Sequence, residues 1–274
     1  MITHFANAPV SAWAKANLIQ GMCWTKDPKT GKEYVFIGQA QRGGSGDVED
    51  AIFHRHELVG DKLLFRDTMI LRKGGHPQSF HVRISVLGKP WIWAGVEQYT
   101  ASRRTGSKLA RFPYVKGTKT TAMKGFTYIE HTVGNTIAAV AGPYSSGPDK
   151  IYVRRAQTLT ETYTEHVEMN LMRGIWKPLR SVTVKRGAGT YQSACANPLE
   201  IVRVNGKTEQ KHWLYRLDWA GHQVSRTDIT AVKAPTGPNT SSEPEGVAHI
   251  RGTLAFAKRF NSVTRRVYAL FAVR

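Results

Sequence analysis

The chain has 274 residues, 41% of them hydrophobic, and carries a formal net charge of +19. This length and apolar content suit one large domain or two small domains with a sizeable core. The charge indicates a polyanionic partner, such as nucleic acid, an anionic membrane or an anionic cell-wall polymer, and an effect on solubility alone is the open alternative.

The two cysteines, Cys23 and Cys195, exclude a disulfide-stabilised scaffold, and no paired-cysteine zinc motif is present. Nothing near Met1 reads as a signal peptide, because residues 3–15 lack an apolar core. No apolar stretch approaches the length of a membrane span. We therefore expect a soluble protein that is made in a cytoplasm and is not inserted into a membrane.

Helical periodicity is almost missing, and only Ala12 to Ile19 fits a short helical turn. Elsewhere, short β-branched and aromatic runs are cut by Gly, Pro, Asn and Asp, which is typical of an all-β fold. Strands are predicted at Ile52–Leu58, Leu63–Leu71, Leu109–Val115, Gly125–Glu130, Tyr163–Met169, Leu179–Lys185 and Gln223–Ile229.

Five further runs are alike and begin 56, 60, 62 and 54 residues apart. They are Tyr34–Ile37, Pro90–Trp93, Lys150–Val153, His212–Tyr215 and Arg266–Ala269. Each follows a turn-rich stretch, such as Asn205-Gly-Lys207 before the fourth run. We predict that these runs occupy equivalent strands.

A second matched strand precedes each turn and begins with a polar residue. These residues, called the polar ring below, are Gln20, Gln78, Asn135, Gln192 and Glu245, at spacings of 58, 57, 57 and 53. A period near fifty indicates a propeller or a solenoid. Several strands per repeat favour a five-bladed β-propeller, with a β-sandwich or solenoid as the alternative.

Propeller symmetry would place the polar ring at one height around a channel mouth, where we expect water rather than a cation beside Glu245. Cys23 and Cys195 hold equivalent places in the first and fourth repeats, so their Cα atoms should lie beyond the roughly 7 Å that a disulfide spans. The last repeat ends after two strands. Residues 1–274 are therefore predicted to form a single propeller domain, in which residues 1–17 include an outer strand, around Ile2 to Val10, that closes the last blade.

Four segments in order resemble a phage family: Tyr34–Gln39, Met69–Phe80 with its Gly-Gly-His, Trp91-Ile-Trp93 and Glu243-Pro-Glu-Gly246. The resemblance is to the propeller domains of phage receptor-binding and tail-fibre proteins, often labelled teichoic acid biosynthesis protein C, to which helveticin-like bacteriocins are related. Pro77 departs from the Gly that commonly follows the His. The resemblance implies a five-bladed propeller in a virion tail or baseplate and does not imply catalysis.

Candidate ligand-binding residues each have a structural alternative. His76 could bind a sugar, phosphate or metal, although a hydrogen bond to backbone is the favoured interpretation. Trp91 and Trp93 could stack on sugar rings, but core packing between blades is the commoner use of such residues. Glu245 could bind a cation or pair with an arginine.

Basic residues cluster in three stretches that we interpret as loops. They are Arg103-Arg104 with Lys108 and Arg111, then Arg154-Arg155, and Arg265-Arg266. Guanidinium groups suit phosphate, and a solvated surface is the equal alternative.

No nucleophile elbow, metalloprotease motif or phosphate-binding loop is present, so we do not expect an enzyme, a cofactor or a metal. The leading hypothesis is a phage tail or baseplate protein in the virion. It would bind an anionic glycopolymer of the host surface, such as teichoic acid, or support the module that does. The expected partners are other tail proteins and further copies of the chain. Alternatives are a secreted helveticin-like antibacterial protein, a cell-wall polysaccharide-degrading enzyme and a nucleic-acid-binding protein.

Overall fold

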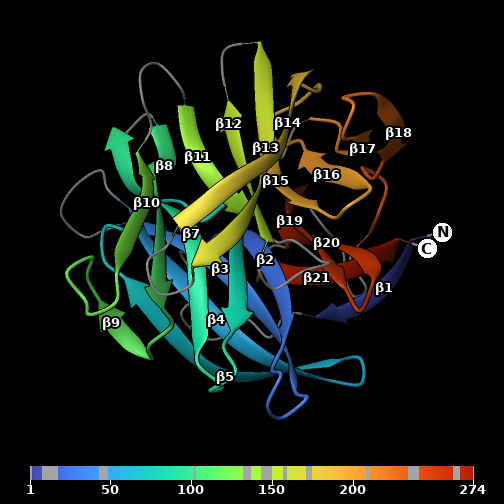
Figure 1. Cartoon of the computed structure of the whole chain (residues 1–274). Coiled ribbons are helices and arrows are strands. Elements are labelled where there is room, and N and C mark those ends of the chain that lie inside the picture. The colour runs from blue at the N-terminus through green and yellow to red at the C-terminus, as the bar shows by residue number, and fades with distance from the viewer. Residues whose placement is uncertain are drawn as a thin grey trace.

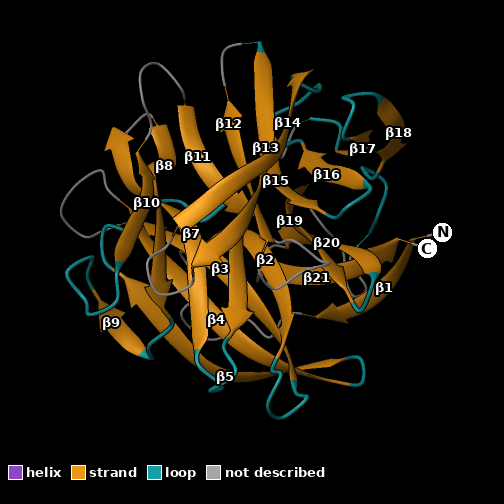
Figure 2. Cartoon of the chain, viewed as in Figure 1, coloured by secondary structure: helices purple, strands orange, loops and turns teal. Residues whose placement is uncertain are grey.

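The computed structural model is built of strands throughout the part of the chain that it describes (Figure 2). The described residues are 2–7, 18–42, 49–100, 103–131, 137–142, 150–156, 159–170, 175–207, 210–233, 241–261 and 266–273. No helix within these ranges is long and apolar enough to cross a membrane. The expected helical turn at Ala12 to Ile19 falls mostly outside them, and its last two residues begin a strand.

Five sheets follow one another around a common centre in chain order, so the fold is a five-bladed β-propeller (Figure 1). The first sheet contains β2 (Leu18–Lys26), β3 (Glu33–Arg42), β4 (Glu49–Val59), β5 (Lys62–Leu71) and β9 (Gly117–Lys119). The second contains β6 (Phe80–Ile84), β7 (Pro90–Thr100), β8 (Arg103–Pro113) and β10 (Thr127–His131). In the chain, β9 lies between β8 and β10 of the second sheet, but it pairs in parallel with β5 of the first. It therefore connects the first two blades.

The third sheet contains β11 (Ile137–Gly142), β12 (Lys150–Ala156), β13 (Thr160–Asn170) and β14 (Ile175–Lys185). The fourth contains β15 (Tyr191–Ala196), β16 (Glu200–Asn205), β17 (Trp213–Asp218) and β18 (Gln223–Asp228). The fifth contains β19 (Ser241–Ile250), β20 (Thr253–Asn261), β21 (Arg266–Val273) and β1 (Ile2–Asn7).

The ring of blades closes through the N-terminal strand. β1 pairs antiparallel with β21, from Ile2 opposite Val273 to Asn7 opposite Ala269. This is the outer place that the sequence assigned to the segment around Ile2 to Val10. The fifth blade takes three strands, not two, from the C-terminal end of the chain, because residues 253–261 form a strand of their own between β19 and β21.

The five similar runs do not all lie on equivalent strands. Three of them lie on the second strand of their blade, in β3, β7 and β12. Trp213–Tyr215 and Val267–Ala269 lie on the third strand of theirs, in β17 and β21, so the prediction was wrong for these two blades. The true second strands there are β16 and β20, and the turn at Asn205-Gly206 follows the second strand instead of preceding it.

Buried apolar side chains fill the interfaces between neighbouring blades. Phe53 of the first blade meets Phe80 of the second edge-to-face, with ring centroids 5.1 Å apart. The interfaces are exemplified by Val35 with Ile250, Phe53 with Phe80, Trp93 with Ile151, Tyr163 with Ile201 and Val202 with Phe256. Each blade is therefore stabilised mainly by hydrophobic burial against its two neighbours.

The first strands of the blades lie innermost and touch one another around the axis. Ser79 of the second blade and Ser193 of the fourth approach to 3.2 Å between their hydroxyl oxygens. The inner strands are therefore in contact across the axis at this level. Both cysteines are free and buried on inner strands, and each has its own contact: Cys23 accepts from the Val82 amide, and Cys195 lies 3.6 Å from His249 Nδ1.

Gly21 marks the closest approach of these inner strands. A Cβ at this position would lie 2.8 Å from the carbonyl oxygens of both Pro77 and Gln78. These are backbone atoms of the next blade, which cannot rotate away as a side chain would. We expect Gly21→Ala to lower the free energy of unfolding by about 2 kcal/mol through overpacking, measured by urea denaturation. Unchanged stability would mean that the first two blades lie farther apart at the axis than described.

Candidate functional site

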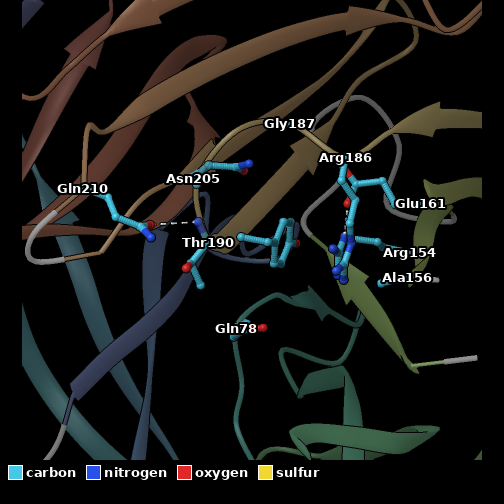
Figure 3. Close-up of a pocket in the computed structure, with 11 residues that line it drawn as sticks. Gln78, Arg154, Ala156, Glu161, Arg186, Gly187, Thr190, Asn205 and Gln210 are labelled. Atoms are coloured by element: carbon cyan, nitrogen blue, oxygen red, sulfur yellow. Dashed lines mark hydrogen bonds and ion pairs between the residues drawn. The ribbon is translucent and has the colours of Figure 1, made fainter. Parts of the chain in front are cut away.

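A cavity of about 480 Å³ lies where the second, third and fourth blades meet, beside the start of β15 (Figure 3). Its lining includes Gln78 from the second blade and residues of β12, β13 and the β14–β15 connection. Figure 3 shows Arg154, Glu161 and Arg186 on one side, called the cationic wall below. Asn205, Gln210 and Thr190 lie on the other side and are called the amide wall.

The cationic wall is built around one buried carboxylate. Glu161 on β13 is 2% exposed, and its Oε2 accepts from Arg154 Nε on β12 at 2.6 Å. Its Oε1 pairs with Arg203 from β16, so a fourth-blade side chain reaches across to the third blade. Because both oxygens are held by guanidinium groups, the carboxylate is fixed in one orientation.

The two paired arginines are also stacked on aromatic rings. The Arg154 guanidinium lies 3.5 Å from the ring centroid of Tyr191, and that of Arg203 lies 4.7 Å from Tyr215. Cation–π contact strengthens when the charge is desolvated. Burial lowers the pKa of Arg203 to about 10, helped by the charge of Arg154. Arg203 therefore stays protonated at neutral pH and keeps its charge inside the fold.

Arg186 adds a further positive charge at the cavity. It is exposed, and no carboxylate pairs with it among the residues that the structure describes. Burial of part of the side chain and the Arg154 charge lower the pKa of Arg186. Three guanidinium groups face one carboxylate, a local charge of 3 − 1 = +2. An anion would relieve this repulsion, so the cationic wall is suited to bind one.

The connection that carries Arg186 is held in one conformation. Gly189 has a φ of +83°, which favours glycine. A Cβ on Gly187 would lie 2.6 Å from an Arg203 guanidinium nitrogen, so this connection packs directly on the buried arginine. The Ala188 amide donates to the Tyr215 hydroxyl at 3.0 Å, and the Thr190 amide donates to Gln210 Oε1 at 3.1 Å.

The amide wall carries an unsatisfied buried acceptor. Asn205 is 2% exposed, and its Nδ2 donates to the Ala188 carbonyl at 3.2 Å. Its Oδ1 has no hydrogen-bond partner among the described residues. Nearly all buried polar atoms in folded proteins are hydrogen-bonded, so this oxygen is an exceptional acceptor on a residue that lines the cavity.

No protein-family model matches the chain, and no curated protein matches its sequence. Among solved structures, the tail fibre of Staphylococcus aureus phage P68 is similar, with a TM-score of 0.73 at 14% identity. The match covers 99% of this chain and 52% of that one, so the chain spans about half of that tail fibre. Two glycosidases are more distant: a xylan β-1,4-xylosidase from Bacillus halodurans C-125, and a Trypanosoma rangeli sialidase. The xylosidase match has a TM-score of 0.43 at 10% identity and covers 88% and 56% of the two chains; the sialidase match has 0.45 at 7% and covers 93% and 53%.

The tail-fibre likeness supports the fold that the sequence predicted. Among the described residues that line the cavity, Glu161 is the one carboxylate, and two guanidinium groups hold it. The described part of the lining therefore presents more positive than negative charge to a ligand.

His76 lies away from this cavity and pairs with a carboxylate. Its Nδ1 is 2.6 Å from Glu49 Oε2, and both side chains are less than 9% exposed. Gly74 and Gly75 permit the turn before it: a Cβ on Gly74 would lie 2.8 Å from Ala51 Cβ, and Gly75 has a φ of +82°. The partner is a side chain and not the backbone that we had favoured.

The two candidate tryptophans belong to the interface of the second and third blades. Trp93 is 1% exposed in the cluster with Ile151 and Val153, which leaves no ring face open to a sugar. Trp91 is half-buried beside it, and the Arg111 guanidinium lies 4.7 Å from its ring centroid. Neither lines the cavity.

The basic stretches that we interpreted as loops lie on strands. Arg103 and Arg104 begin β8, and Arg154 with Arg155 belongs to β12. Arg266 begins β21, while Arg265 lies outside the described residues. Charge alone suggested loops, but strands tolerate these residues where a carboxylate or an aromatic ring receives them, as Arg154 shows.

The described members of the polar ring differ in their surroundings. Gln78 lines the cavity, whereas Gln20, Gln192 and Glu245 are at most 5% exposed. Each of these three is the extra residue at a register shift in its inner strand, so a β-bulge turns its side chain inward. The corresponding shift in β11 falls at Ala138, and Asn135 lies outside the described residues.

Two members of the polar ring have polar neighbours within the protein. Gln192 Nε2 donates to the Gly206 carbonyl and to Glu243 Oε1, both at 2.6 Å. Glu245 lies 3.6 Å from an Arg259 guanidinium nitrogen. Burial and the neighbouring Glu243 hold the pKa of Glu245 well above its usual value. No cluster of three or more His, Cys, Asp or Glu suited to a metal occurs in the described part of the chain.

Sequence reasoning flagged Arg154 but missed Glu161, Arg186, Arg203 and Asn205. Together with Arg154 they come from β12, β13, β16 and the β14–β15 connection, and only the circular arrangement of blades brings them together. One local signal was available: Arg186-Gly-Ala-Gly189 places an arginine beside two glycines, the pattern of a tight connection next to a packed site.

Proposed function

We propose that this chain is a phage tail protein, located in the virion, that binds an anionic glycopolymer on the host cell surface without catalysing a reaction. The observation that carries the proposal is the likeness to a phage tail fibre over 99% of the chain. The family resemblance of the four ordered sequence segments supports the same assignment.

Charge supports a polyanionic receptor. The chain carries a net charge of +19, and the cavity between the third and fourth blades holds a local excess of +2. A surface of this sign attracts a polyanion at long range, and guanidinium groups then bind its phosphate or carboxylate groups. Several copies in one virion would multiply weak contacts into firm attachment.

The location is tested on phage particles from cells that carry the gene. Immunogold electron microscopy of purified particles is expected to label the tail or baseplate. Label on the capsid alone, or none on any particle, would contradict a tail protein.

Polymer binding is tested with immobilised teichoic acid and neutral dextran as probes. We expect capture on teichoic acid and little on dextran, with affinity falling at least tenfold between 50 and 300 mM NaCl because salt screens exposed charges. Replacing Arg103 and Arg104 by glutamate, at the start of β8, should slow capture. The matched control is Lys26→Glu with Lys29→Glu, an equal charge change at exposed residues near the opposite end of the inner strands. Equal capture on both probes would contradict anionic recognition and leave a structural role in the tail.

A further inference from the structure

We propose that the cavity between the third and fourth blades binds one sugar or polyol unit bearing a single phosphate or carboxylate group. The anionic group would lie on the cationic wall, and a hydroxyl of the same unit would donate to Asn205 Oδ1 on the amide wall. This inference rests on the proposed function, because it names the recognition element that a polymer would present.

The anionic end is assigned by which guanidinium still has free donors. Arg154 through its Nε and Arg203 through a terminal nitrogen pair with Glu161, and both side chains are buried, so they contribute mainly fixed positive charge. Arg186 is exposed and has no carboxylate partner among the described residues, so its donors can reach a ligand. Arg186 therefore makes the direct contact, and the buried pair behind it sets the potential.

The other end is assigned by the unsatisfied acceptor. Asn205 Oδ1 is buried without a partner among the described residues, while Nδ2 of the same amide is held by the Ala188 carbonyl. That bond fixes the orientation of the amide, so the atom left without a partner on the amide wall is an acceptor and not a donor. A hydroxyl or N–H group of a ligand can satisfy it, whereas an ionised carboxylate, which only accepts, cannot.

The two ends are walls of one cavity, and its volume of about 480 Å³ suits a single unit more than a long chain segment. Figure 3 shows Arg186 and Asn205 on opposite sides, with Thr190 and Gln78 below them. A ligand with charge at one end and hydroxyls along its length can therefore span the cavity. Inorganic phosphate would fill one end only.

The test is calorimetric titration of the full chain with four probes: glucose 1-phosphate, N-acetylneuraminic acid, inorganic phosphate and glucose. Glucose 1-phosphate or N-acetylneuraminic acid should bind at least tenfold more tightly than phosphate or glucose. Whichever of the two acids binds identifies the anion as phosphate or carboxylate. Failure of both acids to bind overturns the proposal.

Three variants locate the site. Arg186→Gln should lower the affinity for the acid at least tenfold. Asn205→Ala should lower it to a similar extent and leave the affinity for inorganic phosphate unchanged. Arg226→Gln removes one exposed charge from the outer strand β18 and should change nothing. Unchanged affinity for the acid in Arg186→Gln overturns the proposal. So does an Asn205→Ala variant that loses as much affinity for inorganic phosphate as for the acid, because that would indicate a general disruption of the fold.

Polymer capture separates this proposal from the proposed function. If the acid binds in the cavity but immobilised teichoic acid is not captured, the polymer-binding function fails and the cavity assignment stands. If capture persists in Arg186→Gln while the acid no longer binds, the polymer is bound elsewhere on the surface.

Discussion

Replacing Lys258 by methionine should lower the free energy of unfolding by about 3 kcal/mol. A hydrogen bond from a charged donor contributes about 1.5–3 kcal/mol, and the three bonds lost here come from one ammonium group, so their contributions do not add in full. Lys258 on β20 is fully buried. Its Nζ donates to the carbonyls of Ile229, Thr230 and Val232 at 2.9, 2.8 and 3.0 Å. These carbonyls belong to the segment after β18, so one ammonium group ties the end of the fourth blade to the fifth.

Methionine is the informative replacement, since it keeps most of the apolar stem and removes only the donors. Urea denaturation followed by tryptophan fluorescence measures the change. Lys62→Met is the matched control, because Lys62 is exposed at the start of β5 and should change stability by less than about 0.5 kcal/mol. Similar values for the two variants would mean that the carbonyls are satisfied without the ammonium group.

The sequence predicted the blade count because its strongest signal repeats once per blade. Polar residues followed by small ones, as at Gln20-Gly21 and Glu245-Gly246, mark the inner strands, where a bulge and a close backbone approach require them. That requirement comes from the crowded axis and is therefore the same in several blades. The second strands have no such constraint, so they need not share one sequence pattern.

The misplaced runs follow from this difference. The second strand of the fourth blade reads Glu200-Ile-Val-Arg-Val-Asn205, without an aromatic residue, so a search for aromatic strands passes to Trp213–Tyr215 in the next strand. Adjacent strands of one sheet are equally apolar because both pack against neighbouring blades. Periodicity alone therefore cannot tell them apart, and the spacing of 62 residues before His212 was the visible sign of the slip.

The cavity could not be predicted in the same way. Glu161 and Arg203 belong to different blades and are 42 residues apart in the sequence (203 − 161 = 42), yet they form one ion pair. Each looks like an ordinary alternating strand residue in its own segment. Their buried position becomes apparent only when the third and fourth sheets are packed together. Removing one partner of this pair is costly because the interface between the two sheets excludes water from the charge that remains.

Glu161→Gln should move stability and anion binding in opposite directions. The substitution leaves the buried guanidinium groups of Arg154 and Arg203 without their counter-charge, and breaking a buried ion pair in this way costs about 3–5 kcal/mol. The local charge at the cavity would rise from +2 to +3, so the folded variant should bind an anion more tightly than the unmodified chain. Urea denaturation measures the first effect, and titration with glucose 1-phosphate or N-acetylneuraminic acid at 10 °C, where the variant is still folded, measures the second.

Glu33→Gln is the matched control for this variant. Glu33 pairs with Arg251 at 2.5 Å on the surface, with side-chain exposures of 17% and 41%, and such exposed pairs contribute at most about 1 kcal/mol. The control should therefore lose little stability and leave anion affinity unchanged. Weaker anion binding by a folded Glu161→Gln would mean that the carboxylate positions Arg154 for direct contact with the ligand. The positive potential of the cationic wall would then matter less than the geometry that Glu161 imposes on it.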